Sequence, residues 1–512
     1  MNEIGHLITG DISNGLAFRI FTKSNVSVGD FVLLKDKHLE TENEFIGRIT
    51  NIGLSVLGRN DFLADMSTQI EVSPLKVDPH EFRESRSEVL VRMAEISLIG
   101  ILDDNSIAPP KKIPNHLCPV HIPTIKHMDW ITTKGDINIG NLRAEMSGKG
   151  NIPIYMDSEI LVKKHLFIAA MTGSGKSVTV KTIISELYKH DKVGILIFDV
   201  HGEYGYSSNK IKGLKDLSRD DVRIYGFGDK ADNQLKIYYN DLTLSDIYHF
   251  YDWSSAQREA LGIIFYAKTN PLEYIQKNEA NTIKDEYGIH KDTANVLKRR
   301  VGQIISGAID FVTSDDVSNL FDQILEDLRL KRIVIIDFTK ISEKSENILI
   351  NNITRHILNY NKKIVQNEDK NPHDIMIVLE EAQRFLDPSE YQNKGVMREL
   401  VREGRKFGVG LCAITQIPRF FDERILSQFN TYIILKLANA RDRAILEGGS
   451  PQNISDMFTE IATLHPGEAV IVGEAIPLAL PVKINNFDDL DLKNYKREKE
   501  EINPVTDKMG VS

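Results

Sequence analysis

Two different hydrophobic patterns divide the chain. Up to about residue 125, short alternating apolar runs are separated by glycine, asparagine and aspartate, as in LAFRIF, DFVLLK, EFIGRITNI and EVLVRMAEISLIGIL. A period of two, with turn residues between the runs, is typical of short β-strands. We therefore predict a small all-β barrel over residues 1–126, with the proline-rich passage APPKKIPNHLCPVHIP at its end.

From residue 127 the apolar runs are continuous and helical segments lie between them. Six of these runs are typical of buried strands: HLFIAA, VGILIFD, RIVIIDF, IMIVLEE, VGLCAIT and TYIILKL. Their alternation with helices predicts a parallel α/β sheet. Residues 241–330 carry apolar residues at helical spacing and no clear strand. We expect an α/β core over 127–240 and 331–486, a helical insertion between its two parts, and a closing hairpin in AVIVGEAIPLALPVKI. A C-terminal tail follows over 487–512, and its charged stretch KNYKREKEEINPVTDKMGVS is expected to be flexible.

Composition and charge limit the location and the partners. The chain has 512 residues, 41% apolar and 27% charged, which fits a soluble protein of two or three domains. Its net charge is -10, so any contact with DNA must be confined to a pore or groove. The start MNEIGHLITG is not a signal pattern, and the two cysteines have no metal-binding spacing. We expect a cytoplasmic protein.

The segment FIAAMTGSGKSVTV nearly matches the phosphate-binding pattern G-x-x-x-x-G-K-[ST]. Gly175, Lys176 and Ser177 complete its second half, but Ala170 replaces the first glycine. In such a loop the backbone N–H groups and the lysine bind phosphates, and the serine hydroxyl binds Mg²⁺. A methyl group fits at position 170 if φ is negative. We predict a working site for ATP and Mg²⁺ formed by Thr172, Gly173, Ser174, Gly175, Lys176, Ser177 and Val178.

A second candidate element is IMIVLEEAQRF, a buried strand that ends in Glu380 and Glu381. One carboxylate could orient the shell of the magnesium ion while the next polarises the attacking water. Aspartate is more usual than glutamate at the first of these two positions, so Glu380 is the weaker candidate for direct contact with the metal. We therefore predict Glu381 as the general base and give Glu380 a supporting role beside the magnesium ion. The alternative is that both carboxylates simply face solvent at the end of a strand. The P-loop about 200 residues earlier in the chain favours the catalytic interpretation.

Two further strand ends carry polar groups. In IFDVHGEYG, Asp199 and Glu203 could reach Mg²⁺ or the water from a neighbouring strand, and a capping role for Asp199 is equally open. In AITQIP, Gln416 could sense the γ-phosphate, with a polar strand cap as the alternative.

The segment MRELVREGRKFG places Arg398, Arg402 and Arg405 on one helical face. Glu399 and Glu403 alternate with them, so a solvated, ion-paired helix is one interpretation. The other is an arginine finger, an arginine that one subunit of a ring inserts into its neighbour's site to stabilise the transition state. We favour Arg405 over Arg402 for that role.

Over nearly its whole length the chain resembles the HerA family of the HerA/FtsK-type DNA translocases. The resemblance rests on a predicted β-barrel followed, in this order, by HLFIAAMTGSGKSVTVK, DVHGEY, LEEAQRF, REGRKFGVGL and ITQIP. The resemblance implies an N-terminal HAS barrel, a RecA-like P-loop core interrupted by helices, and a C-terminal segment that reaches an adjacent subunit. It also implies a homo-hexameric ring that moves double-stranded DNA through its pore with ATP. The partner nuclease would be NurA-like, or a sirtuin-like effector in anti-phage defence.

Several residues occupy positions of the family's motifs. Lys176 and Ser177 match the Walker A pair, Glu381 the catalytic glutamate, Gln416 the sensor and Arg405 the finger. Lys164 stands where the family often has arginine, so it would act on a neighbour's phosphate as a point charge without a bidentate fork.

A different class of function also fits the sequence. The ring could be an ATP-bound scaffold that assembles and activates an effector nuclease without processive translocation. Translocation needs basic side chains in a pore, and Lys210, Lys212 and Lys394 are candidates for them, although a solvated surface position is the simpler interpretation of each.

Overall fold

The structure is a computed structural model of the chain, which forms two compact units. It describes residues 2–12, 15–21, 23–38, 41–56, 90–103, 106–131, 135–143, 151–207, 211–305, 311–313, 320–367, 371–386, 395–476 and 478–491. Unit 1 comprises Met1–Met156, Ile434–Glu447 and Gln452–Asn485, and unit 2 comprises Asp157–Ile433, Gly448–Pro451 and the chain from Asn486 on. The expected domain boundaries stay predictions.

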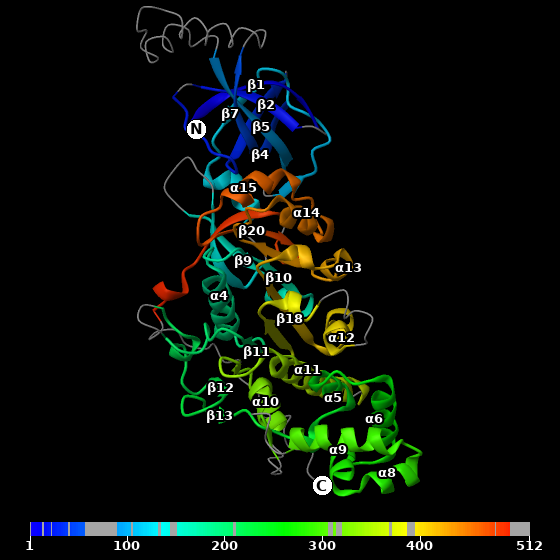
Figure 1. Ribbon diagram of the computed structural model, residues 1–512. Coiled ribbons are helices and arrows are strands. Elements are labelled where there is room, and N and C mark those ends of the chain that lie inside the picture. Colours follow the sequence, from blue (N-terminus) through cyan, green and yellow to red (C-terminus); the bar gives the residue numbers. More distant parts are fainter. Residues whose placement is uncertain are drawn as a thin grey trace, which may run out of the picture. The chain divides into compact units, whose positions relative to one another are not determined.

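The first part of unit 1 is a closed antiparallel barrel (Figure 1). Within the described residues its order is β2-β1-β7-β3-β4-β5, and β5 pairs back with β2. Closure leaves no free edge among these strands. The buried face carries Phe18, Val32, Phe45 and Ile96, none more than 1% exposed. The strands are β1 (Glu3–Asp11), β2 (Gly15–Ile20), β3 (Phe31–His38), β4 (Thr41–Val56), β5 (Leu90–Asp103) and β7 (Pro119–His121), and β6 (Ser106–Ala108) pairs with β5.

This barrel confirms the predicted fold of the N-terminal region. The apolar runs quoted from the sequence correspond to β2, β3, β4 and β5. The strands β1 and β7 were not singled out, because β7 is only three residues long and β1 is largely exposed along its second half.

The rest of unit 1 contains four strands in the order β20-β21-β8-β9, each antiparallel to its neighbour. The predicted hairpin is therefore confirmed as β20 and β21. The elements are η1 (Ile125–Ile131), β8 (Ile137–Leu142), β9 (Pro153–Met156), η8 (Ser455–Met457), α15 (Phe458–Thr463), β20 (Glu468–Gly473) and β21 (Leu480–Ile484).

Unit 2 is built on a sheet with the order β13-β12-β16-β11-β17-β18-β10-β19, parallel from β13 to β10. Every residue of β10, β11, β17 and β18 is buried, which explains their continuous apolar runs. All six predicted core strands are present. The strands are β10 (Leu166–Ala169), β11 (Gly194–Asp199), β12 (Val222–Gly226), β13 (Asn233–Gln234), β16 (Ile333–Asp337), β17 (Ile375–Leu379), β18 (Val409–Thr415) and β19 (Thr431–Ile434).

Helices cover both faces of this sheet. The chain moves along the sheet in one direction from β10 to β11 and in the other from β16 to β17 and β18. Because parallel crossovers are right-handed, α4 lies on one face and α11 and α12 on the other (Figure 1). None of the described helices is long and apolar enough to cross a membrane. The helices of this part are α3 (Ser158–Lys163), α4 (Lys176–Lys189), α11 (Glu343–Gln366), α12 (Val396–Glu403) and α13 (Glu423–Leu426). Most of α14 (Ala440–Gly449) belongs to unit 1.

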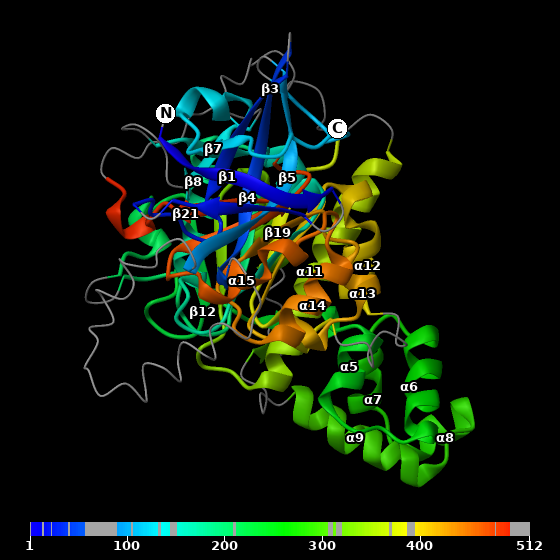
Figure 2. The same ribbon diagram turned by 90° about the horizontal axis from the view of Figure 1, so that it is seen from above.

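The segment between β13 and β16 is the predicted helical insertion. Figure 2 shows α5 to α9 gathered beside the helices of the core. Capping boxes at Thr243 and Ser254 begin α5 and α6, since each side chain accepts an otherwise unpaired helix N–H. The prediction of no strand here is wrong in one detail, because Val312 and Thr313 pair with Ile237 and Tyr238. The elements are β14 (Ile237–Tyr238), α5 (Leu244–Phe250), α6 (Ser255–Ala267), α7 (Pro271–Lys277), α8 (Ala280–Tyr287), α9 (Lys291–Ile305), β15 (Val312–Thr313) and α10 (Leu320–Arg329).

The last described residues pack against α4. Lys181 of α4 is 2% exposed, donates from Nζ to the Lys212 carbonyl at 2.9 Å, and lies 5.8 Å from the centre of the Phe487 ring. Burial lowers the pKa of Lys181. Lys212 in turn donates from its backbone N to Asp488 at 2.8 Å and from Nζ to the Leu490 carbonyl at 2.7 Å.

These contacts concern two predictions made from the sequence. Residues 487–490, the first of the predicted C-terminal tail, form η9 (Phe487–Asp489) with a fully buried Phe487, and the charged stretch predicted to be flexible lies in residues 492–512, outside the described residues. Lys212 is bound within the fold and is not a free pore cation. Lys210 and Lys394 also lie outside the described residues.

A buried carboxylate joins the barrel to the rest of unit 1. Glu460 of α15 is 2% exposed and forms ion pairs with Arg48 of β4 and Arg143. Burial, together with the nearby Arg143, lowers the pKa of Arg48 to about 9. The carboxylate therefore compensates the buried guanidinium of Arg48 and the partly exposed one of Arg143.

We expect Glu460→Gln to lower the free energy of unfolding of unit 1 by about 3–5 kcal/mol, because it leaves buried cations without their counter-charge. Urea denaturation, with hydrogen exchange of β4 and α15 peptides, measures this. Glu468→Gln is the matched control: its carboxylate lies 3.8 Å from Arg143 at a more exposed position, and its removal should cost under about 1 kcal/mol. Equal effects of the two variants would contradict the prediction.

Candidate nucleotide site

The predicted phosphate loop connects β10 to α4. Gly173 and Gly175 have φ of +78° and +98°, a region that favours glycine. Ala170 is not among the described residues with positive φ, is fully buried, and donates its N–H to the Thr415 carbonyl at 3.1 Å. Its methyl group therefore fits the strand exit, as expected.

The register of the sheet brings the predicted groups to one edge. Ala169 of β10 is opposite Thr415 of β18, Leu379 of β17 is opposite Ala413, and Phe198 of β11 is opposite Leu379. The strands are parallel, so the residues after their carboxyl ends lie side by side, where α/β sheets bind ligands. These residues are Thr172, Lys176, Ser177, Asp199, Glu203, Glu380, Glu381 and Gln416.

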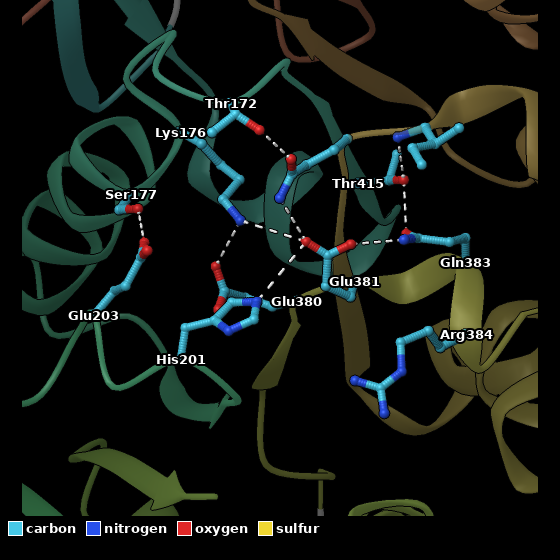
Figure 3. A network of polar contacts seen from close by, with 12 residues as sticks. Thr172, Lys176, Ser177, His201, Glu203, Glu380, Glu381, Gln383, Arg384 and Thr415 are labelled. Carbon is cyan, nitrogen blue, oxygen red and sulfur yellow. Dashed lines mark hydrogen bonds and ion pairs between the residues drawn. The ribbon is translucent and has the colours of Figure 1, made fainter. Parts of the chain in front are cut away.

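Lys176 lies between the two carboxylates of the second motif. Its Nζ is 3.0 Å from Glu380 Oε1 and 3.9 Å from Glu381 Oε1 (Figure 3). Tyr204, fully buried, donates its hydroxyl to Glu380 Oε1 at 2.9 Å. Glu380 is also fully buried, and among the described residues its Oε2 has no hydrogen-bond partner. That oxygen has acceptor capacity that a cation could use.

Asp199 organises the turn that follows β11. It accepts the backbone N–H groups of Glu203 at 3.0 Å and Tyr204 at 3.1 Å, which is the capping role considered from the sequence. Burial, with a further contribution from the Glu380 charge, raises the pKa of Asp199 to about 6. Its role toward Mg²⁺ stays a prediction. Glu203 accepts the hydroxyl of Ser177, so the turn places a carboxylate beside the predicted magnesium ligand.

These groups fit a magnesium ion chemically. Ser177, Glu203, Glu380 and Asp199 offer only oxygen atoms, which Mg²⁺ prefers, and Glu380 Oε2 is a buried oxygen without a described donor. Ser177 and Glu380 would hold the ion, with Glu203 and Asp199 beside them. When bound, Mg²⁺ supplies positive charge for the phosphate oxygens.

The carboxylate of Glu381 is held by two side-chain amides. Gln416 donates from Nε2 to Glu381 Oε1 at 2.8 Å, and Gln383 donates from Nε2 to Oε2 at 2.6 Å. Glu381 has φ of +47° and starts the turn η4 (Ala382–Arg384), a conformation uncommon for residues other than glycine. Such outliers cluster at active sites. Gln383 and Arg384 were not singled out, although both stand in the quoted LEEAQRF.

Arg384 anchors this turn to the neighbouring helix. It lies 2.8 Å from Glu346 and 3.0 Å from Glu343, both in the first turn of α11. The ion pairs fix the end of the turn that carries Glu381 and Gln383. Sequence alone could not pair these residues, because they come from different elements.

Lys164, Arg402 and Arg405 do not join this cluster. Lys164 precedes β10, and η6 (Gly404–Phe407) precedes β18, so these residues lie at the amino ends of the strands. Seven residues of strand separate the two edges by roughly 20 Å. Arg402 and Arg405 are exposed. An action on their own subunit's nucleotide therefore does not fit, whereas an action on a neighbour stays a prediction.

The intervening glutamates pair with lysines. Glu399 of α12 contacts Lys362 of α11, and Glu403 lies 3.9 Å from Lys406. The ion-paired helix considered from the sequence is thus partly present, with lysine in place of arginine. Arg398 is half-buried and makes contacts within the fold.

A buried histidine ties β10 to this arginine-bearing segment. His165 is 3% exposed, accepts the Leu411 N–H at Nδ1 at 2.9 Å, and lies with Nε2 3.1 Å from the Val401 carbonyl. Nε2 must therefore carry the proton and Nδ1 must not. Burial, with a smaller effect of Arg405, lowers the pKa of His165 to about 4.

Comparison with known proteins identifies the family of the chain. The family described as "Helicase HerA, central domain" matches residues 137–357. The DNA double-strand break repair helicase HerA of Saccharolobus solfataricus is 31% identical over 363 residues, covering 69% of each chain. The chain belongs to the HerA family. Another HerA relative, the double-strand break repair helicase of Pyrococcus furiosus, is 24% identical over 96% of this chain and 93% of that protein.

Membership of the HerA family makes this chain an ATP-hydrolysing enzyme with a RecA-like P-loop core. Among solved structures, VirB4 of Thermoanaerobacter pseudethanolicus is similar at 15% identity and a TM-score of 0.48, covering 69% of this chain and 97% of that one.

We expect His165 of the HerA-family chain to contribute a loss of stability as the pH falls from 6.5 to about 4, which opposes the gain from Asp199, whose pKa is raised to about 6. In this window His165 stays neutral in the folded state while the unfolded chain binds the proton, so the free energy of unfolding drops by up to about 3 kcal/mol. Urea unfolding between pH 4 and 8 measures the slope. His165→Asn, whose side-chain amide does not titrate and which tolerates positive φ, should remove the His165 contribution and so change the slope between pH 4 and 6.5. An unchanged slope in the variant would contradict the assignment.

Proposed function

We propose that the chain uses ATP hydrolysis to move double-stranded DNA, as a hexameric ring of identical subunits that works with a partner nuclease. Support comes from relatives named DNA double-strand break repair helicase HerA, one of which aligns with 96% of this chain. The observation that carries the proposal is the placement of Lys176, Glu381 and Gln416 on adjoining strand ends.

In the proposed reaction Glu381 takes a proton from the attacking water as the γ-phosphate bond to ADP breaks. Lys176, which neutralises Glu380 and Glu381 in this structure, would turn to the phosphates, where its charge stabilises the transition state. Gln416 would sense the γ-phosphate through its contact with Thr172 in the P-loop.

The distance between the candidate base Glu381 and the candidate finger Arg405 within one subunit supports a ring. The base lies at the carboxyl ends of the strands, whereas Arg405 lies at their amino ends. An arginine so far from its own site would complete the site of the next subunit. The nuclease partner, NurA-like or sirtuin-like, and the pathway, DNA repair or anti-phage defence, rest on the family resemblance.

We expect linear double-stranded DNA to stimulate ATP hydrolysis, and Glu381→Gln to lower kcat by about 10²–10⁴-fold, the usual contribution of a general base. Steady-state ATPase assays with and without DNA measure both effects. Glu326→Gln, at an exposed position of α10, is the control and should behave as the parent.

Hydrolysis that ignores DNA, with Glu381 still required, would overturn translocation and favour the scaffold that activates a nuclease. Hydrolysis that survives Glu381→Gln would remove this residue as the base.

For the ring, we expect Lys176→Ala and Arg405→Ala each to abolish most hydrolysis alone, and their mixture to regain part of it. A Lys176→Ala subunit still offers Arg405 to the intact P-loop of an Arg405→Ala neighbour. Lys406→Ala, the adjacent exposed cation in η6, should retain activity and serves as the control. A mixture no more active than its components would argue against an arginine supplied by a neighbour.

A further inference from the structure

The two amides on Glu381 are themselves oriented by hydroxyl groups. Thr172 Oγ1 donates to Gln416 Oε1 at 2.5 Å, and Thr415 Oγ1 donates to Gln383 Oε1 at 2.7 Å. An amide that accepts a proton at its oxygen presents its NH₂ group on the other side. Two relays of the same polarity, hydroxyl to amide to carboxylate, therefore converge on the two oxygens of Glu381 (Figure 3).

The two relays rest on different parts of the fold. Thr172 is an exposed residue of the P-loop, so its relay through Gln416 starts in the loop that would bind phosphate. Thr415 is fully buried in β18, and its Oγ1 also accepts the N–H of Ile417 at 3.0 Å. The relay through Gln383 therefore starts from the sheet and uses no group that a nucleotide would contact.

The backbone around Glu381 is held in place, but this alone does not fix its carboxylate. Glu381 is at a positive φ, and its carbonyl accepts the Arg384 N–H at 2.9 Å, so its backbone is held. The three side-chain torsions of a glutamate remain free unless the carboxylate is bound. Gln383, two residues further in the same turn, binds Oε2 and leaves Oε1 directed toward Lys176 and Gln416.

We propose that Gln383 is a positioning residue for ATP hydrolysis, which fixes the carboxylate of Glu381 in one orientation, and that Thr415 acts through Gln383. The inference rests on the proposed role of Glu381 as the base. Gln383 gains and loses no proton in the reaction. It reduces the orientations that the base samples before the water is deprotonated.

The main test is Gln383→Met, which keeps the length of the side chain and removes its hydrogen bonds. We expect kcat to fall about tenfold while KM for ATP and the Kd of a fluorescent ATP analogue stay within about twofold. The reason is that Gln383 acts on the base and does not contact the nucleotide. Gln323→Met, at an exposed position of α10, is the matched control and should leave kcat unchanged.

Thr415→Val tests the relay, because it keeps the buried shape and removes the hydroxyl. We expect a several-fold fall in kcat, and a double variant with Gln383→Met whose loss is well below the product of the two single losses, since both changes remove the same relay, while Thr415→Val also removes the acceptor of the Ile417 N–H. A double variant whose losses multiply would overturn the action of Thr415 through Gln383.

Parallel assays of Glu381→Gln separate the two levels of inference. If Glu381→Gln abolishes hydrolysis and Gln383→Met hydrolyses ATP at the parent rate, the role of Gln383 is wrong and the base stands. If Gln383→Met raises KM, or loses activity only in proportion to a lower melting temperature, the positioning role is also wrong. If Glu381→Gln keeps the parent rate, the proposed base itself fails.

Discussion

The parallel register of β10, β18 and β17 determines where each reactive group of the site can lie. β18 separates β10, which leads into the P-loop, from β17, which is followed by Glu380. The residue after β18, Gln416, therefore lies between Thr172 and Glu381 and contacts both. If β18 slipped by one residue against its neighbours, the side chains of Thr415 and Gln416 would each point to the other face of the sheet from the one they occupy now. Both relays to the base would then be lost together.

The carboxylates at the carboxyl ends of the parallel strands need a cation to compensate their charge. Asp199 and Glu380 are buried at the ends of neighbouring strands, at 1% and 0% exposure, and the Glu380 charge adds to burial in raising the pKa of Asp199. Lys176 supplies the compensating charge here. Because the same lysine is expected to bind phosphates, its departure would leave the carboxylates uncompensated, and a divalent ion bound by oxygen atoms would restore the balance.

Sequence reasoning located most of the fold and much of the site because both depend on local patterns. The continuous apolar runs predicted β10, β17 and β18, and the spacing of glycine, lysine and serine predicted the P-loop. The roles of Gln383 and Thr415 were not foreseen, since each depends on a contact across the sheet that no spacing encodes. The position of Arg405 at the far edge became clear only from the direction of β18, and the burial of Phe487 against α4 could not be foreseen because it depends on a contact between segments far apart in the sequence.

The contact between α4 and residues 487–490 has a consequence for synthesis of the chain. α4 leaves the ribosome early, but the ring of Phe487 and the carboxylate of Asp488 emerge only after nearly the whole core. Until then Lys181 and the Lys212 segment lack these partners, and chains fold from the N-terminus as they emerge. The helix that begins with Lys176 therefore reaches its full packing last, although its sequence is among the first of the core to be made.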